Sequence, residues 1–201
     1  MKYLLYRFLR VFIRPFMHIF YRVEYQGLEN IPTNDGFILA GNHKNNLDCL
    51  LLMSSTKRTI HFLAKIELME KYGFFFKKMA IIPVDRKKKN KEAMEEAKKV
   101  LENHEVIGIF PEGTFNDTEY VVRPFKYGAV KLSCDTNKKI VPFAIINDYK
   151  LFRKSVKIIF GKPYNVHDKL DLTKENNILM NKVIRLLRSE DNAQQITRKM
   201  V

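Results

Sequence analysis

The amino-acid sequence predicts an α/β protein in which a mixed, largely parallel sheet is layered with helices. Two observations lead to this fold class: short apolar runs alternate with longer stretches of helical periodicity, and the connections between them are short. A length of 201 residues suits one sizeable core. We therefore expect a single domain over residues 23–201, preceded by an N-terminal amphipathic helical segment over residues 1–22.

The N-terminal segment is rich in large apolar side chains, but it contains no uncharged apolar run of the ~18–20 residues that a membrane span requires. Its basic side chains recur at steps of three and four and would form one narrow helical stripe; they are Arg7, Arg10, Arg14 and His18. An apolar helix with a cationic stripe suits an anionic membrane surface, and Pro15 is expected to kink or divide it. We therefore expect a membrane-associating helix; the alternative is a helix that caps the protein's own core.

The strands that we expect are short apolar runs bounded by turn residues. They begin with a short strand and turn within Val23–Pro32 and continue as Gly36–Gly41, Ile60–Ala64, Ala80–Val84, Val106–Phe110, Ile140–Ile146 and Val156–Phe160. Helical spacing of apolar residues predicts helices that begin at Cys49, cover Lys87–Asn103, run through Ala129–Cys134 and cover about Lys174–Arg188, followed by a polar tail.

Three of the expected strands end directly in chemically active side chains. These are His43 with Asp48, then Asp85 with Arg86, then Glu112 with Gly113 and Thr114. In a parallel α/β sheet, ligands bind beyond the carboxyl ends of the strands, so these residues are expected to share one site. They would provide a base with an orienting acid, a guanidinium suited to phosphate, and a second carboxylate that accepts a substrate hydroxyl.

His43 and Asp48 lie five positions apart. On an ideal helix this spacing would separate them by about 140°, so they can meet only across a turn. We expect Asp48 at the N-terminus of the following helix, where it would cap the helix and still reach the imidazole. Taken alone, this spacing is also compatible with a structural histidine.

The charge balance predicts a polyanionic partner. The chain has 36 Lys and Arg against 22 Asp and Glu, a formal net charge of +14, which would attract nucleic acid, an anionic membrane surface or phosphorylated substrates. The glycine-rich phosphate loop and the dinucleotide fingerprint are absent from the sequence. Cys49 and Cys134 lie far apart without a Cys/His cluster, so we expect no metal site and no disulfide, as in a reducing cytoplasm.

Several motifs in a fixed order resemble the four motif blocks of the glycerophospholipid acyltransferases, most closely the bacterial 1-acyl-sn-glycerol-3-phosphate acyltransferases. They are Asn42-His43 with Asp48, Pro83-Val84-Asp85-Arg86, Phe110-Pro111-Glu112-Gly113-Thr114 and Ile140-Val141-Pro142-Phe143, with Ala64-Lys65, Glu67-Leu68, Phe125-Lys126 and Gly128-Ala129 as ancillary pieces. The resemblance covers about Val23 to Val166, which would make residues 23–201 an acyltransferase domain.

The resemblance implies transfer of a fatty acyl group from a thioester, acyl-CoA or acyl-carrier protein, to the sn-2 hydroxyl of lysophosphatidate. The product would be phosphatidate, for phospholipid biosynthesis, and no cofactor beyond the thioester co-substrate would be needed. An enzyme of this kind is expected at the cytoplasmic face of the cell membrane as a peripheral or monotopic protein. Another lysophospholipid or glycerol-3-phosphate is the alternative acceptor.

The resemblance also implies residue roles. His43 would act as the base and Asp48 would orient it, while Glu112 would position the glycerol portion of the acceptor. Arg86 would bind the acceptor phosphate, with Lys65 and Lys126 as further cationic candidates or, alternatively, as solvated surface lysines. Gly113 and Thr114 would shape the loop that closes over the acceptor. A backbone N–H is required for the oxyanion, and the sequence does not identify it.

One position departs from the family pattern. Phe115 follows Glu112-Gly113-Thr114 where an arginine or a serine is usual, so one expected phosphate contact is missing. Either Arg123 replaces that charge, which we favour, or the acceptor head group differs from lysophosphatidate.

A rival hypothesis is a non-catalytic basic protein that binds a membrane surface or nucleic acid, with His43 structural. The sequence contains no groove-reading motif, and its aromatic residues are concentrated in the N-terminal segment rather than among the lysines. We therefore expect an anionic membrane surface, a lysophospholipid and an acyl thioester as partners, and no nucleic acid.

Overall fold

The structure, a computed structural model, describes residues 3–67, 73, 78–85, 91–146 and 148–199, with side chains through residue 189. Within these residues it forms a seven-stranded sheet in the order β1-β7-β6-β2-β5-β3-β4. The strands are β1 Glu24–Gln26, β2 Phe37–Gly41, β3 Ile60–Lys65, β4 Ile81–Val84, β5 Val106–Ile109, β6 Ile140–Ile146 and β7 Lys157–Phe160. The helices are α1 Leu4–Tyr21, the short 3-10 helix η1 Leu28–Asn30, α2 Asp48–Ser55, α4 Lys91–Glu102, α5 Gly128–Thr136 and α6 Leu172–Lys199.

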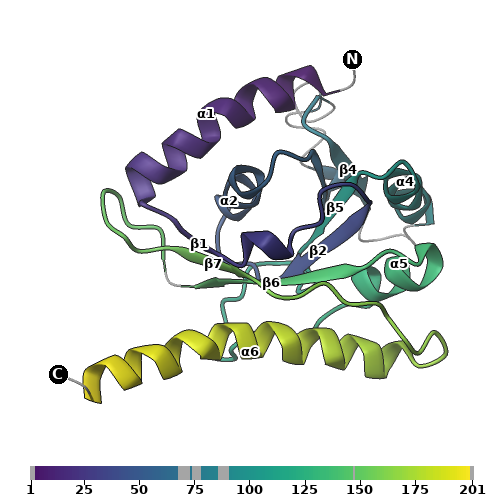
Figure 1. The fold of residues 1–201 in the computed structure, drawn as a ribbon. Helices are drawn as coiled ribbons and strands as arrows, with labels where there is room; N and C mark the ends of the chain where they lie inside the picture. Colours follow the sequence, from purple (N-terminus) through teal and green to yellow (C-terminus); the bar gives the residue numbers. More distant parts are fainter. Residues whose placement is uncertain (1–2, 68–72, 74–77, 86–90, 147, 200–201) are drawn as a thin grey trace.

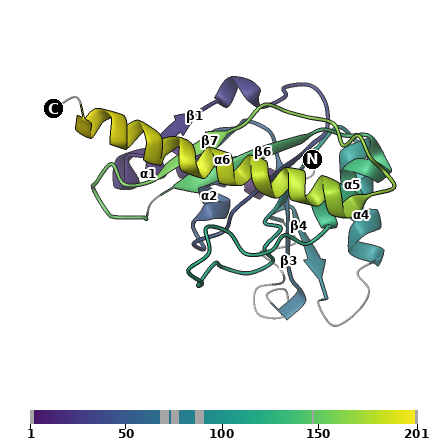
Figure 2. The same cartoon turned by 90° about the horizontal axis from the view of Figure 1, so that it is seen from below.

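Helices cover both faces of the sheet. In Figure 1, α1 and α2 lie above it and α6 below, and Figure 2 shows α6 running across the lower face. The strand β2 shows why: alternate side chains point to opposite faces, so Leu39 joins the core under α1 and α2 while Ala40 joins the core with α4, α5 and α6. All neighbouring strands are parallel except β6 and β7. The predicted mixed, largely parallel α/β sheet is therefore confirmed.

The centre of the sheet fixes where a site can form. All five residues of β2 are buried between β5 and β6. A Cβ at Gly41 would lie 2.2 Å from the carbonyl oxygen of Phe143, so only glycine lets the two strands approach this closely. Because β2, β3, β4, β5 and β6 are mutually parallel, their carboxyl ends meet at one edge of the sheet.

Helix α1 has both an inner and an outer face. Tyr6 and Met17 are 0% exposed, and the Tyr6 hydroxyl accepts a hydrogen bond of 3.0 Å from the backbone N–H of Ile60. Arg10, expected in the basic stripe, instead donates to the carbonyl of Thr56. Pro15 was expected to kink or divide the helix, and α1 runs through it as a single element, so Pro15 does not divide the helix. The alternative of a helix that caps the core therefore describes the inner face.

The outer face of α1 is apolar and exposed. Its large side chains recur along one side of the helix; they are Leu4, Phe8, Val11, Phe12, Phe16 and Ile19, and the first three, with Ile19, are each about 60% exposed. Arg7, Arg14 and His18 are exposed beside this face. Among the described residues, no helix combines the length and apolarity needed to cross a membrane.

One helix boundary differs clearly from the prediction. Helix α6 continues to Lys199, so the stretch expected as a polar tail is helical. Helix α4 is described from Lys91, and residues 87–90, which were expected in the same helix, lie outside the described part of the chain.

Candidate active site

His43 leaves the carboxyl end of β2 and is held on several sides by the loop that follows β5. Its backbone N–H donates to Oε1 of Glu112 at 2.9 Å, and its carbonyl accepts the N–H of Asn116 at 3.0 Å. The imidazole stacks on Phe110 with ring centres 3.9 Å apart and meets the edge of Phe115 at 4.4 Å. The ring therefore has one well-defined position, with its side chain 16% exposed.

Asp48 is the orienting partner of this imidazole. Its Oδ2 lies 2.8 Å from Nδ1 of His43, and the same oxygen accepts the N–H groups of Lys44 at 2.7 Å and Asn45 at 2.8 Å. The carboxylate is 0% exposed. A carboxylate accepts only, so Nδ1 carries the proton and Nε2 carries the lone pair. No described residue hydrogen-bonds to Nε2, which leaves it available to a substrate hydroxyl.

The expected turn between His43 and Asp48 is therefore present, but the expected cap is wrong. Asp48 is the first residue of α2, Leu47 occupies the cap position, and no side chain caps the helix. The Asp48 carboxylate instead bonds back into the turn at residues 43–45, to the imidazole of His43 and to two backbone N–H groups.

Glu112 connects two loops. It is 4% exposed, and besides the N–H of His43 it accepts the N–H of Arg123 at 2.7 Å through Oε2. Burial raises the pKa of Glu112, although these two hydrogen bonds and the nearby cations act in the opposite direction. Both oxygens are thus committed to backbone donors, and the predicted contact with a glycerol portion stays a prediction.

Three of the predicted substrate-binding side chains lie near the Glu112 loop or at the end of the neighbouring strand β3. Lys126 lies across Gly113, since a Cβ at that glycine, whose φ is +70°, would come within 2.9 Å of the lysine Nζ. Thr114 is exposed beside it, and Lys65 is exposed at the carboxyl end of β3. These side chains thus lie near the edge of the sheet that carries His43, and among the described residues none of the three forms a hydrogen bond or ion pair with His43 or Asp48.

Two arginines, Arg123 and Arg86, were also predicted to bind the acceptor phosphate. The guanidinium of Arg123 forms an ion pair with Asp117, a carboxylate that is 80% exposed. A phosphate would have to compete with that carboxylate for the guanidinium. Arg86 lies outside the described residues, whereas its neighbour Asp85 directly follows β4.

Sequence reasoning missed Tyr149. Its hydroxyl donates to Oδ1 of Asp48 at 2.7 Å, from the loop between β6 and β7. The signal was present: the apolar run Ile140–Ile146 ends in polar residues just as the strands before His43 and Glu112 do. Applied to this strand as well, the strand-end argument would have included Tyr149.

Two further residues of the site have structural roles. The side-chain amide of Asn42 bonds to both the carbonyl and the N–H of Ile145, at 2.9 and 2.7 Å, and so joins the end of β2 to β6.

Cys49 follows Asp48 on α2, and burial, with the negative charge of Asp48 adding to it, raises the pKa of its thiol to about 12. Such a thiol stays protonated at neutral pH and is not an activated nucleophile.

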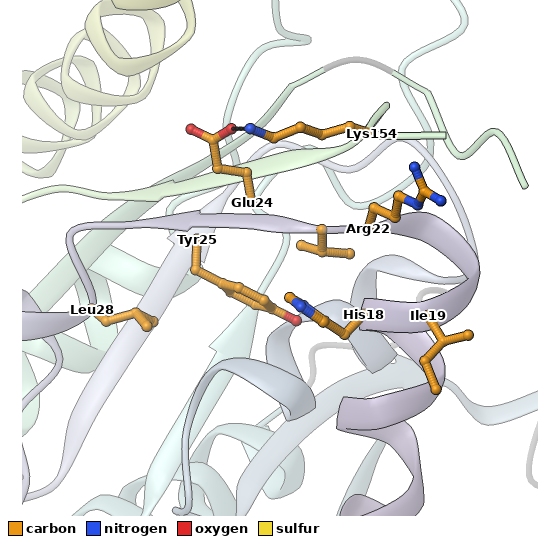
Figure 3. Close-up of a pocket in the computed structure, with 8 residues that line it drawn as sticks. His18, Ile19, Arg22, Glu24, Tyr25, Leu28 and Lys154 are labelled. Atoms are coloured by element: carbon orange, nitrogen blue, oxygen red, sulfur yellow. Dashed lines mark ion pairs between the residues drawn. The ribbon is translucent and has the colours of Figure 1, made fainter. Parts of the chain in front are cut away.

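A cavity of about 800 Å³ opens at another place, between the C-terminal end of α1 and β1. Figure 3 shows the side chains of His18, Tyr25 and Leu28 around it, with Lys154 paired to Glu24 above. None of its lining residues belongs to the dyad. Within the described part of the chain, no group of three or more His, Cys, Asp or Glu side chains is arranged to hold a metal ion.

A comparison of the chain with models of protein families agrees with the motif order and the site geometry. A model of the family described as Acyltransferase matches residues 22–146, well over half of the chain. The chain belongs to this family. The match contains His43, Asp48 and Glu112 and ends at the last residue of β6.

Related acyltransferases carry more specific names. The chain is 32% identical over 153 residues to the 1-acyl-sn-glycerol-3-phosphate acyltransferase of Bacillus subtilis (strain 168), covering 73% of this chain and 75% of that protein. It is 34% identical over 148 residues to the protein of the same name from Borreliella burgdorferi, covering 70% of this chain but 57% of that protein.

A solved structure supports the fold. The crystal structure of the 1-acyl-sn-glycerophosphate acyltransferase from Thermotoga maritima aligns with a TM-score of 0.69, covering 93% of this chain and 87% of that chain. At 22% sequence identity, this likeness concerns the acyltransferase fold alone.

Proposed function

We propose that this acyltransferase moves a fatty acyl group from a thioester to the sn-2 hydroxyl of lysophosphatidate and so forms phosphatidate. The observation that carries the proposal is the buried His43–Asp48 pair with Nε2 of His43 open, at the carboxyl edge of the sheet. Relatives named 1-acyl-sn-glycerol-3-phosphate acyltransferase support the choice of acceptor.

In the proposed reaction His43 acts as general base and then as general acid. Nε2 takes the proton of the acceptor hydroxyl as its oxygen attacks the thioester carbonyl, and Asp48 stabilises the imidazolium that forms. The tetrahedral intermediate then breaks its C–S bond and expels a thiolate, whose thiol has a pKa of ~8.5, and the imidazolium of His43 returns the proton to it. The protonated state of the Cys49 thiol supports direct transfer without an acyl-enzyme.

Binding of the acceptor phosphate is assigned to cations around the Glu112 loop. Lys126 lies against this loop, and Lys65 extends from the neighbouring strand β3. Arg86 completes the proposed set on sequence grounds. Glu112 and Gly113 act by fixing the course of the loop on which Thr114 and Phe115 are presented, because Glu112 bonds to backbone on both sides.

We place the enzyme on an anionic membrane, at the cytoplasmic face of the cell membrane, as a peripheral or monotopic protein. The exposed apolar face of α1 would enter the acyl boundary, and Arg7, Arg14 and His18 would meet lipid phosphates. Leu151 and Phe152 extend this apolar surface, since each is about 60% exposed and Phe152 packs on Phe20 at 5.4 Å.

The reaction is tested with a mixed pool of acceptors and donors. Purified full-length protein in detergent micelles is given lysophosphatidate, lysophosphatidylglycerol and glycerol-3-phosphate, with acyl-CoA or acyl-carrier protein as donor, and the products are identified by mass spectrometry. Phosphatidate is expected as the main product. A product from another acceptor would overturn the assignment of lysophosphatidate, and no acylated product from any pair would contradict the reaction itself.

Membrane association is tested by changing only the outer face of α1. Deleting the helix would expose the core that Tyr6 and Met17 cover, so we use the triple variant Phe8→Gln, Phe12→Gln and Ile19→Gln. It is expected to stay in solution when anionic liposomes are sedimented. The matched control Leu170→Gln, which removes an apolar side chain that is 99% exposed outside α1, is expected to sediment like the wild type. Equal sedimentation of the triple variant and wild type would contradict the assignment.

A further inference from the structure

Tyr149 has contacts with two parts of the molecule that are far apart in the sequence. Its hydroxyl donates to Oδ1 of Asp48, the residue that orients the catalytic imidazole. Its ring meets the edge of Tyr21, the last residue of α1, with ring centres 5.5 Å apart and planes at 90°. Tyr149 lies three residues beyond the region matched by the family model, residues 22–146.

The carboxylate of Asp48 depends on this hydroxyl. Oδ2 is occupied by the imidazole of His43 and by two backbone N–H groups, whereas Tyr149 is the donor that the described residues supply to Oδ1. Because Asp48 is 0% exposed, water does not readily replace a lost donor. Burial, with the negative charge of Asp48 adding to it, raises the pKa of Tyr149, so the hydroxyl remains a donor throughout the physiological range.

The loop that carries Tyr149 is also attached to the end of α1. The N–H of Phe152 donates to the carbonyl of Phe20, and the two rings pack at 5.4 Å. Phe16 continues the contact along α1, 4.9 Å from Phe20. Figure 1 shows the same arrangement, with the β6–β7 loop beside the C-terminal end of α1.

The end of α1 also borders open space. The cavity in Figure 3 lies between His18 and Ile19 of α1 and Tyr25 and Leu28 of the following segment. The aromatic contacts with Tyr149 and Phe152 therefore contribute to holding the last turn of α1 in place.

We propose that Tyr149 is a positioning residue that holds the Asp48 carboxylate for catalysis. It also couples the geometry of this carboxylate to the position of the C-terminal end of α1. This inference rests on the proposed acyl transfer by His43. The Tyr149 hydrogen bond draws negative charge away from the carboxylate, so its loss leaves Asp48 a stronger partner for the imidazolium. The neutral imidazole that acts as base then becomes available only at higher pH.

Other ionisable groups near the dyad are not expected to cause the same shift of the pH dependence. They are Cys49 on α2, Tyr25 on β1, Glu112 after β5, and Lys44 with Asp148 at the surface. Burial raises the pKa of Cys49 and of Tyr25, so both stay neutral near pH 7. Glu112 reaches His43 through the backbone, and the Lys44–Asp148 pair carries compensating charges.

The test is Tyr149→Phe in the full-length protein, with Tyr25→Phe as matched control. Tyr25→Phe also removes one tyrosine hydroxyl bonded to α2, through Ser54 at 2.5 Å. For Tyr149→Phe we expect kcat to fall about five- to twentyfold with KM for the acceptor nearly unchanged, because the lost hydrogen bond acts on the dyad. The acidic limb of its kcat/KM profile is expected to move to higher pH, while Tyr25→Phe retains the wild-type profile.

The outcomes separate this inference from the proposed function. If wild type transfers no acyl group, the proposed function fails; if wild type is active and the Tyr149→Phe profile superimposes on it, only the role of Tyr149 fails. An equal shift in Tyr25→Phe would also overturn it, since the effect would then be general to α2. ¹⁵N-labelled histidine adds a readout independent of turnover, because the ring signals of His43 should titrate at higher pH in Tyr149→Phe.

A second variant tests the connection to α1 and remains informative if Tyr149→Phe is unstable. Tyr21→Leu keeps the Tyr149 hydroxyl and removes the edge contact between the rings. The same direction of pH shift with a smaller fall in kcat is expected, measured in detergent micelles so that membrane binding does not contribute. An unchanged profile in Tyr21→Leu would overturn the connection between α1 and the dyad.

Discussion

The His43–Asp48 dyad and the outer face of α1 are built in opposite ways. At the dyad, both oxygens of a fully buried carboxylate have hydrogen-bond partners, and the imidazole is fixed by two aromatic rings. On α1, Leu4, Phe8 and Val11 are about 60% exposed and make no comparable network. The proton transfer that we propose for the dyad needs one geometry, whereas the membrane contact that we propose for α1 needs only apolar area and positive charge. Rate and membrane binding should therefore be separable by mutation.

The largest loss of rate is expected from Asp48→Asn. An amide cannot accept from all the donors that face this position, so the imidazole loses its fixed tautomer and at least one donor is left without an acceptor. We expect kcat to fall about 10³- to 10⁴-fold in steady-state assays, with liposome binding retained. Asp148→Asn, at a nearby carboxylate that is 76% exposed, is the control and should keep wild-type activity. Comparable activity of Asp48→Asn and Asp148→Asn would refute the role of Asp48.

Glu112→Gln is expected to have an intermediate effect. One of its two backbone donors would face the amide NH₂, so the connection between the His43 and Arg123 segments is weakened. We expect about 1–3 kcal/mol lower stability in urea denaturation and about 10- to 100-fold lower kcat/KM. Glu119→Gln, an exposed glutamate in the same loop, provides the control. If Glu112→Gln matches this control in both measurements, Glu112 does not hold the loop.

Phe115→Arg is expected to improve binding of lysophosphatidate and to lower the rate of the reaction. An arginine beside Thr114 and Lys126 would add a phosphate contact but remove the ring that meets His43 at 4.4 Å. We expect KM for lysophosphatidate to fall about two- to fivefold while kcat also decreases. Tyr120→Arg, at a ring that is 74% exposed in the same loop, should change neither constant. A higher KM in Phe115→Arg would count against phosphate binding at this position.

The pH dependence of stability gives the smallest expected effect. Because burial raises the pKa of Glu112 in the folded protein, its contribution to stability is fully present below the unfolded pKa and is lost as pH rises through the folded pKa. The stability of wild type relative to Glu112→Gln should therefore decrease as the pH rises above the ordinary glutamate range of about pH 4. Urea titrations at increasing pH check the sign, and an increase of this relative stability with pH would contradict it.

The sequence predicts the sheet well because its strands are buried runs of strong apolar pattern. Ile140–Ile146 and Val106–Ile109 are apolar along their whole length, as strands covered on both faces must be. The pairing of His43 with Asp48 also follows from spacing together with a strand end. In contrast, nothing in the sequence states that both oxygens of Glu112 bind backbone N–H groups, because those donors come from distant segments.

Helix α1 shows a different limit of sequence reasoning. Periodicity identifies its basic stripe, but the choice between core and surface depends on which elements lie beside it. The structure divides the helix: Tyr6 and Met17 are buried, while Phe8 and Phe12 are exposed. Arg10 belongs to the basic stripe by spacing and yet bonds to the carbonyl of Thr56, because α2 packs along that side.

The most direct test compares His43→Ala with the outer-face triple variant of α1 in the same two assays. One assay is acyl transfer to lysophosphatidate in detergent micelles, and the other is sedimentation with anionic liposomes; His167→Ala, at an exposed histidine, is the control. We expect His43→Ala to bind liposomes like wild type with activity lowered at least about 10³-fold, and the triple variant to lose liposome binding while it retains activity in micelles. Undiminished acyl transfer by His43→Ala would contradict the account.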